Sequence, residues 1–190
     1  MNMKSKRTPA AEVRSLLTAA AHRVLARDGE RGLTVRAVAA EAGVAPMGVY
    51  NHFDGKDGLL VEVIDDGFRR LGDQFRGREV DAMARFRQSG YRYRQFAIEN
   101  PTIYRMMFSG KTRATTEVAL GTFMAMVDVI TYGQAAGVIR ADDPVALTLY
   151  IWSTVHGAVS LELEQAAPPF MDPADSYEGL LDFIARATAP

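Results

Sequence analysis

One stretch, residues 34–56, constrains the fold most because it carries the local signals of two short helices joined by a tight turn. Thr34 suits a helix N-cap, where its hydroxyl accepts from a free backbone N–H, so a helix should begin at about Val35. Gly43 can adopt the positive φ needed just past the end of that helix. Pro46 then fits the first turn of a second helix, where an N–H would lack a partner anyway. The stretch therefore predicts a helix-turn-helix.

The polar side chains outside this small core suit a nucleic acid. Lys56 falls in the first turn of the following helix, where a cation opposes the helix dipole. A phosphate docked on the free N–H groups of that turn would satisfy both the dipole and the lysine. A helical hairpin with a solvated polar face gives the same pattern, so the residues alone leave the structural and the DNA-binding interpretations equally open.

A resemblance to a known family favours the DNA-binding interpretation over the structural one. The segment 16–60 resembles the DNA-binding domain of the TetR (tetracycline repressor) family of bacterial transcription regulators, and the run A-G-V-x-x-x-x-V-Y-x-H-F-x-x-K from Ala42 to Lys56 carries the likeness. Family members often place Ser or Thr and a polar residue where this chain has Ala45 and Pro46, so its recognition helix is poor in base-reading groups. The DNA-binding residues that the resemblance implies are Thr34, Arg36, Ala45, Pro46, Met47, Gly48, Tyr50, Asn51, His52 and Lys56.

Composition limits the remaining choices. Residues 1–58 hold nine Lys/Arg and six Asp/Glu, whereas the rest of the chain holds thirteen and seventeen, so positive potential belongs to the N-terminal third. The absence of Cys excludes disulfides and thiolate metal sites. No run approaches roughly 18 consecutive apolar residues, and the basic start, with Lys4, Lys6 and Arg7, lacks an apolar signal segment. We expect a cytoplasmic protein without a membrane partner.

Long patterns of period 3.6 and little alternation predict an all-α protein of about nine helices. The resemblance implies a DNA-binding domain at 1–55 and an effector-binding and dimerisation domain at 56–190. Gly67, Gly72 and Gly77 are expected to let the fourth helix bend. Four arginines, Arg85, Arg87, Arg92 and Arg94, are expected on the solvated face of the fifth helix.

The C-terminal helices carry many Met and aromatic residues, which serve as core filler or as walls of a ligand cavity. Together with the resemblance they predict an apolar effector pocket with two polar contacts, Tyr93 and His156. Because no Arg or Lys lies in the expected lining, a neutral ligand is favoured over an anionic one. The expected lining is Tyr93, Phe96, Met106, Met107, Phe123, Met124, Val127, Trp152 and His156.

The helix that begins after Asp143-Pro144 is apolar on two sides and needs two partners. A second copy of the chain is the economical cover, giving a twofold homodimer through this helix and the last one. The run 152–157, W-S-T-V-H-G, also resembles the signature of one branch of TetR C-terminal domains. The expected interface residues are Ile151, Val155, Ala158, Leu180, Leu181 and Ile184.

The sequence contains no arrangement typical of an enzyme. Its three His residues fall on separate predicted helices, and there is no H-E-x-x-H, G-x-S-x-G or Walker-type glycine loop. We therefore expect no catalysis, metal or cofactor, and predict a homodimeric regulator, most often a repressor in this family, that binds double-stranded operator DNA and leaves it when a small molecule binds. The alternatives are a constitutive or architectural DNA-binding protein without an effector, and a helical small-molecule-binding protein or enzyme that has lost DNA binding.

Overall fold

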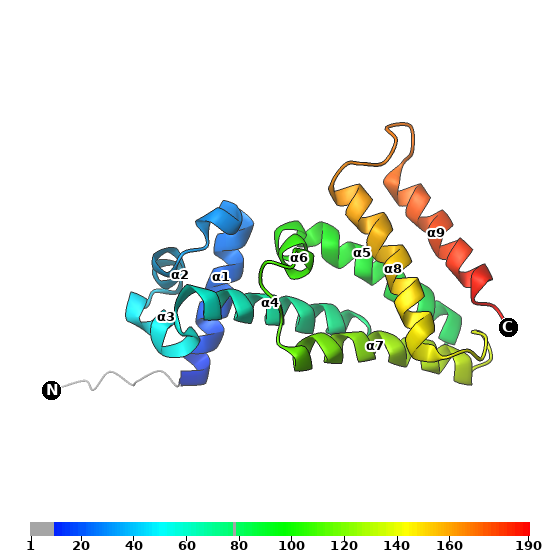
Figure 1. Ribbon diagram of the computed structural model, residues 1–190, viewed down its shortest axis with the longest axis horizontal. Helices are drawn as coiled ribbons and strands as arrows, with labels where there is room; N and C mark the ends of the chain where they lie inside the picture. Colours follow the sequence, from blue (N-terminus) through cyan, green and yellow to red (C-terminus); the bar gives the residue numbers. More distant parts are fainter. Residues whose placement is uncertain (1–9, 78) are drawn as a thin grey trace. The chain divides into compact units, whose positions relative to one another are not determined.

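The computed structural model describes residues 10–77 and 79–190, and its regular structure over those residues is helical throughout, as predicted. The expected basic arm at Lys4, Lys6 and Arg7 lies outside the described residues. The helices are α1 (Ala10–Gly32), α2 (Val35–Ala42), α3 (Pro46–Phe53), α4 (Gly55–Gln74), α5 (Ala82–Glu99), α6 (Pro101–Phe108), α7 (Thr116–Ala135), α8 (Pro144–Leu163) and α9 (Pro173–Ala187) (Figure 1).

The chain forms two compact units. The first is Met1–Gly67 with Thr102–Thr115, and the second is Phe68–Pro101 with Thr116–Pro190. Helix α4 therefore passes from one unit into the other, and α6 belongs to the first. This division differs from the expected domains 1–55 and 56–190, because α6 packs on α4: a Cβ at Gly67 would lie only 2.8 Å from Sδ of Met107.

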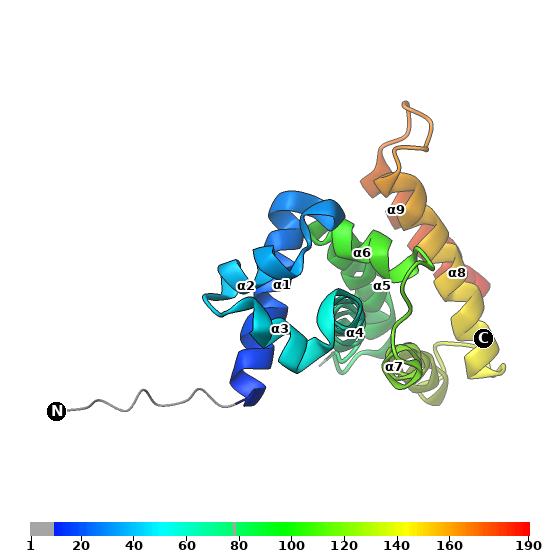
Figure 2. The ribbon, with the colours of Figure 1, turned by 60° about the vertical axis from the view of Figure 1, so that its left-hand side comes forward.

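The first unit contains the predicted helix-turn-helix. Helices α2 and α3 pack on α1 through a core in which Leu17, Val24, Val38 and Val49 are completely buried (Figure 2). Gly29, at a φ of 67°, interrupts the first helix, and helical turns resume after it as far as Gly32. Burial of the apolar face, rather than the local helix preference of these short segments, holds α2 and α3 in place.

The second unit is a bundle of α5, α7, α8 and α9, joined by the C-terminal part of α4. Figures 1 and 2 show α8 and α9 side by side. An aspartate caps the N-terminus of α5, α8 and α9, in each case by accepting from a backbone N–H of the first turn. Gly72 of α4 faces α7, where a Cβ would make an ordinary contact with Thr122 at 3.5 Å from its Cα.

The four arginines of α5 were expected to be solvated, and this expectation is wrong, because all four are half-buried. Arg94 forms two hydrogen bonds to Glu162 of α8, at 2.7 and 2.6 Å, with both side chains mostly covered. Arg92 pairs with Glu79, and Arg87 pairs with two carboxylates of α9. Arg94 and Arg87 therefore join α5 to α8 and to α9 inside the second unit, a role that single-helix patterns do not reveal.

Helices α7 and α8 are long and apolar enough to cross a membrane by length and composition alone. Within the second unit they supply buried side chains such as Val127, Ile130, Leu147 and Val159 to the core. Their high hydropathy comes from the side chains that they bury in this core together with apolar side chains on their outer faces.

Candidate DNA-binding and ligand sites

The turn between α2 and α3 has the predicted geometry. The Thr34 hydroxyl accepts from the backbone N–H of Ala37 at 3.1 Å, which caps α2. Gly43 ends the helix in the left-handed region with a φ of 69°, and Val44 N–H donates to the Ala39 carbonyl at 3.0 Å. A non-glycine residue at this φ would carry backbone strain. The turn therefore fixes the direction in which α3 leaves α2.

Helix α3 presents its first two turns to solvent. Met47 and Tyr50 are 65% and 54% exposed, which is high for large apolar and aromatic side chains in a core-forming unit. Its N-cap, Ala45, makes no side-chain hydrogen bond, Pro46 has no N–H, and the Gly48 N–H donates to the Ala45 carbonyl at 2.8 Å, so the first turn offers a phosphate the Met47 N–H. Of the residues predicted to bind DNA, Gly48 and His52 are half-buried, and the exposed ones are Thr34, Arg36, Ala45, Pro46, Met47, Tyr50, Asn51 and Lys56.

Arg14 of α1 holds the end of α3, a role that the sequence did not indicate. Its guanidinium donates to the backbone carbonyl of His52 at 2.8 Å and lies 4.6 Å from the ring centroid of Phe53. The same group pairs with Glu62 of α4. A cation at a helix C-terminus also interacts favourably with the helix dipole. Arg14 thus joins α1, α3 and α4, and only the folded contacts identify it.

Two other cations of the first unit are engaged within the protein. Arg23 and Arg27 both bind Glu41 of α2, at 2.7 and 2.9 Å. Their hydrogen bonds, that of Arg27 foremost, lower the pKa of Glu41. This cluster neutralises part of the N-terminal excess of positive charge. The predicted phosphate contact at Lys56 therefore depends on fewer accompanying cations than the sequence count suggests.

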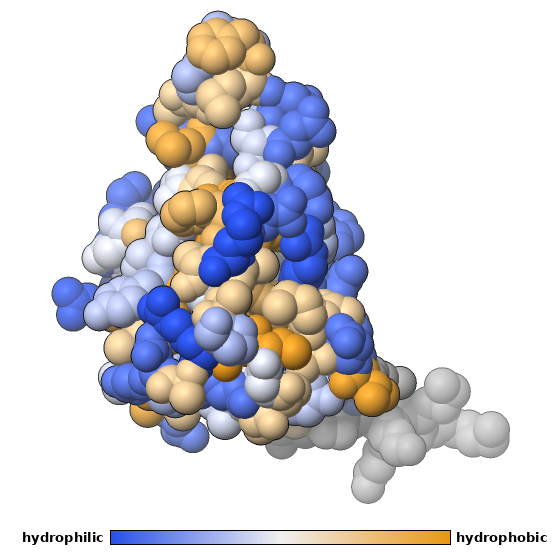
Figure 3. Space-filling view, turned by 90° about the vertical axis from the view of Figure 1, so that its right-hand side faces the viewer, coloured by the Kyte–Doolittle hydropathy of each residue, from blue (hydrophilic) through white to orange (hydrophobic). Residues whose placement is uncertain are grey.

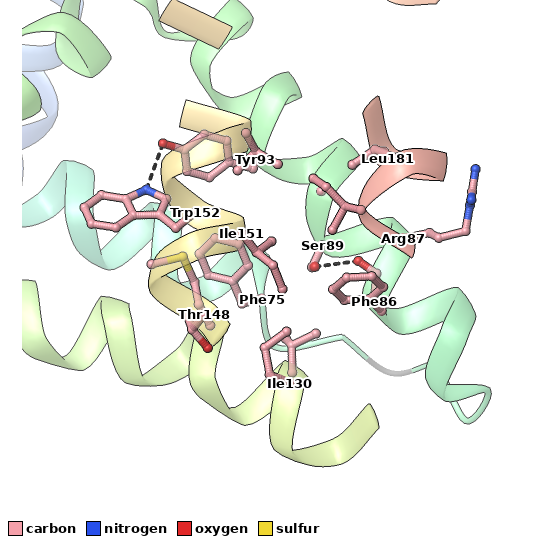
Figure 4. Close-up of a pocket in the computed structure, with 15 residues that line it drawn as sticks. Phe75, Phe86, Arg87, Ser89, Tyr93, Ile130, Thr148, Ile151, Trp152 and Leu181 are labelled. Carbon is pink, nitrogen blue, oxygen red and sulfur yellow. Dashed lines mark hydrogen bonds between the residues drawn. The ribbon is translucent and has the colours of Figure 1, made fainter. Parts of the chain in front are cut away.

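A cavity of about 50 Å³ lies inside the second unit (Figure 4). It is enclosed mainly by apolar side chains from α5, α7, α8 and α9, together with Phe75, which follows α4. The lining residues are Phe75, Phe86, Arg87, Ser89, Gly90, Tyr93, Met126, Val129, Ile130, Thr148, Ile151, Trp152, Val155, Leu181 and Ile184.

A chain of hydrogen bonds links three of the polar residues named by the sequence. Trp152 Nε1–H donates to the Tyr93 hydroxyl at 3.1 Å, and the Tyr93 oxygen lies 2.8 Å from Nδ1 of His156. The indole can only donate, so Tyr93 accepts from it, and in the His156 tautomer that carries its proton on Nε2 the Tyr93 hydroxyl donates to Nδ1. Burial lowers the pKa of His156, which keeps the imidazole neutral and able to accept. The chain joins α5 to α8.

Comparison with known proteins identifies the family. Residues 17–63 match the profile described as bacterial regulatory proteins, tetR family, and residues 86–184 match that of the tetracyclin repressor-like C-terminal domain. The chain belongs to the TetR family. It is therefore a DNA-binding transcription regulator, and the structure places the family's helix-turn-helix at α2 and α3.

Individual relatives extend over nearly the whole chain. An uncharacterized HTH-type transcriptional regulator of Mycobacterium tuberculosis is 29% identical over 98% of this chain and 85% of its own length. A protein of unknown function from Rhodococcus sp. RHA1 is 25% identical with a TM-score of 0.81, and the alignment covers all of both chains. A TetR family transcription regulator from Marinobacter aquaeolei VT8, 19% identical, shares the fold with a TM-score of 0.65 over 93% of this chain and 95% of its own.

The expected effector residues do not form one site. Tyr93 and Trp152 line the cavity. Met106 and Met107 belong to the other compact unit and pack there, so they cannot line this cavity. Met124 is 42% exposed, whereas Phe96 and Val127 are buried outside the lining. Phe123 and His156 are also outside the lining. Phe123 contacts the Trp152 ring, and Nδ1 of His156 lies 2.8 Å from the Tyr93 hydroxyl oxygen.

The expected dimer residues need a similar correction. Val155, Leu181 and Ile184 are buried within a single chain and line the cavity, as does the half-buried Ile151. Leu181 packs against Gly90 of α5, where a Cβ would lie 2.6 Å from Cδ2 of Leu181. Ala158 and Leu180 are half-buried beside a shallow groove of about 260 Å³ between α8, α9 and their loop. Most of the residues predicted for the interface therefore face the interior of the single chain.

The outer faces of α8 and α9 carry exposed apolar side chains that were not among the expected interface residues. In Figure 3 apolar side chains are also exposed at the upper tip, where the α8–α9 loop lies, and in this loop Phe170 is 85% exposed. The exposed large apolar residues of the two helices are Val145, Leu149, Tyr150, Leu161 and Phe183.

Proposed function

We propose that this TetR-family regulator is a homodimeric repressor that leaves its operator when a small, largely apolar molecule binds its C-terminal unit. The observation that carries the DNA-binding part is the exposed α3, which follows a capped, glycine-terminated α2. The cytoplasm is the proposed place of action, and neither a cofactor nor catalysis is part of the proposal.

In this proposal the start of α3 enters the major groove. Pro46 and Met47 contact thymine methyl groups, which gives weaker discrimination than a bidentate hydrogen bond. Arg36 and Asn51 then contribute more of the sequence reading. The phosphate contacts come from Thr34, Tyr50, His52 and Lys56.

Dimerisation supplies the second recognition helix. Two half-sites about one DNA turn apart need two copies of α3 at a fixed spacing. The exposed apolar face of α8 and α9 supports an isologous contact, in which the same surface of both chains meets around a twofold axis. Burying Tyr150 and Phe183, which are 65% and 58% exposed, would remove two large apolar side chains from water.

The test is selection of bound sequences from a random pool of double-stranded DNA by the full-length protein. We expect enrichment of a palindrome whose half-sites are about one helical turn apart. A variant with Met47→Ala and Asn51→Ala serves as the control, because it changes exposed α3 residues and leaves the core intact. Failure to enrich any sequence, or enrichment of the same sequence by the variant, would contradict the assignment of α3 as the reading helix.

A constitutive DNA-binding protein is the second candidate, and the small volume of the cavity favours it. The two candidates differ in one measurement. A repressor of the proposed kind releases the selected DNA in the presence of apolar compounds, whereas a constitutive protein holds it at every compound concentration.

A further inference from the structure

The polar side chains that line the cavity in the second unit already donate hydrogen bonds to other groups of the protein. Ser89 donates to the carbonyl of Phe86 at 2.6 Å, and Thr148 to that of Pro144 at 2.6 Å. Trp152 and Tyr93 use their hydrogens within the chain that ends at His156. A ligand carbonyl or carboxylate placed here would lose its water partners without gaining a donor, and that loss weakens binding.

Arg87 does not supply the missing donor. Figure 4 shows its side chain extending away from the other labelled lining residues. Its guanidinium binds Asp182 at 2.6 Å and Glu178 at 2.8 Å, both on α9. One cation with two carboxylates leaves this edge of the cavity net negative, which repels an anion. The lining therefore selects uncharged, hydrocarbon-like molecules.

The cavity must enlarge before it can hold such a molecule. Its volume of about 50 Å³ is well below the 150 Å³ or so of an apolar cavity known to accept benzene. Interiors are close-packed, so the extra space has to come from the displacement of a whole wall rather than from compression of its atoms.

Helix α9 is a wall of the cavity whose ionic attachment to α5 is partly exposed. It contributes Leu181 and Ile184 to the lining and is fixed to α5 at one edge by the Arg87 pairs. The carboxylates of these pairs are about half exposed, at 47% for Asp182 and 50% for Glu178, and exposed pairs contribute little to stability. Tyr177 adds a hydrogen bond to the Gly90 carbonyl at 2.9 Å.

We propose that the cavity beneath α9 is a binding site for small uncharged hydrocarbon-like molecules, that α9 moves outward to admit them, and that the Arg87 pairs with Asp182 and Glu178 restrain this movement. The proposal rests on the proposed function in treating this cavity as the effector site. Helix α9 also carries the exposed Phe183 of the proposed dimer face. Movement of α9 on ligand binding would therefore change the contact between the two chains of the proposed dimer.

Trp152 provides a direct readout, because it is the one Trp in the chain and it lines the cavity. The full-length protein without DNA is titrated with toluene and, separately, with benzoate, a charged analogue of similar size. We expect a saturable change in Trp152 emission and a raised melting temperature with toluene, and neither with benzoate. Absence of a saturable response to toluene, or an equal response to benzoate, would overturn the proposed ligand class, and DNA selection would still test the function separately.

Two pairs of variants locate the site and its moving wall. Val155→Phe fills the cavity and should abolish the toluene response, whereas Leu120→Phe on the exposed face of α7 should preserve it. Arg87→Met keeps the aliphatic stem and removes the ion pairs, so the toluene Kd should fall about two- to fivefold. Arg76→Met breaks an exposed pair with Asp73 and should leave the Kd unchanged.

Each pair has a contradicting result. If Val155→Phe retains its helical spectrum and still binds toluene, the site lies elsewhere. If Val155→Phe fails to fold, the comparison of toluene with benzoate on the unaltered protein still decides the ligand class. If Arg87→Met binds toluene with the same Kd and association rate as the unaltered protein, α9 is not the wall that moves.

Discussion

Lys56 is the residue at which the proposed DNA contact is simplest to isolate. It is exposed in the first turn of α4, so its replacement removes a charge without disturbing the core. Lys56→Ala should weaken binding to all DNA sequences about equally and make the slope of log K against log salt shallower by about 0.9, because the variant neutralises one phosphate fewer. Fluorescence anisotropy between low and moderate salt measures this slope. Lys111→Ala is the matched control, and equal slopes for the two variants would remove Lys56 from the interface.

His156 makes stability depend on pH. Because burial lowers its folded-state pKa below the unfolded value of about 6.5, the unfolded chain binds more protons in the interval between them. Its stabilising contribution is therefore complete above about pH 6.5 and is lost as the pH falls toward the folded pKa. His156→Asn, which keeps an acceptor for Tyr93 but cannot titrate there, should flatten the fall in melting temperature between pH 7 and 5. Identical pH profiles would show that another group is responsible.

Single-residue signals are reliable where the cause is local. Thr34 acts through its own hydroxyl and Gly43 and Pro46 through their own backbone geometry, and all three occupy the predicted positions at helix ends. Tyr93 and His156 stand out in the sequence as polar residues among apolar ones, but their bond depends on two helices whose contact no local pattern specifies. The sequence could therefore suggest them as ligand contacts without indicating that they satisfy each other.

At the scale of elements, Arg14 tests how α3 is held. Its hydrogen bond to the His52 carbonyl and its contact with Phe53 join α1 to the end of α3. Arg14→Met should lower stability by about 1 kcal/mol, since the guanidinium is partly exposed, and weaken DNA binding without changing the preferred sequence. Thermal unfolding and anisotropy measure the two effects. Arg31→Met, at an exposed position in the last turn of α1, serves as the control.

Helix faces are harder to predict than helices. The sequence indicates the stripe of α9 through Tyr177, Leu181 and Ile184, but a stripe shows only that one face is buried and does not name the partner. The structure supplies α5 as that partner, since Leu181 packs on Gly90. The outer face, with Phe183, has no such signal because a single exposed aromatic residue forms no periodic pattern.

At the scale of the whole molecule, the family and the all-α class could be predicted because one run of residues and the helical period are independent of tertiary contacts. The cavity could not, because its lining is drawn from segments between Phe75 and Ile184 that only the fold brings together. Met106 and Met107 resemble pocket residues in composition, yet α6 belongs to the other compact unit.

The proposed dimer is the property on which the proposed operator binding depends most. A charge at Leu181 would be a poor test, because this side chain is buried within one chain and its replacement would disturb α9 itself. Phe183 lies on the same helix and is 58% exposed, so Phe183→Arg should leave the isolated chain folded. If the face pairs with a second copy, the change places a charge in an apolar contact.

We expect Phe183→Arg to sediment as a monomer with an unchanged helical spectrum and to lose most of its affinity for a two-half-site operator. Affinity for a single half-site should stay the same, because the helix-turn-helix does not contain the substitution. Val80→Arg, at an 88% exposed position before α5, controls for added charge and should remain dimeric. A dimer of unaltered affinity in Phe183→Arg would place the interface on another surface, and the spacing of the two recognition helices would then need a different origin.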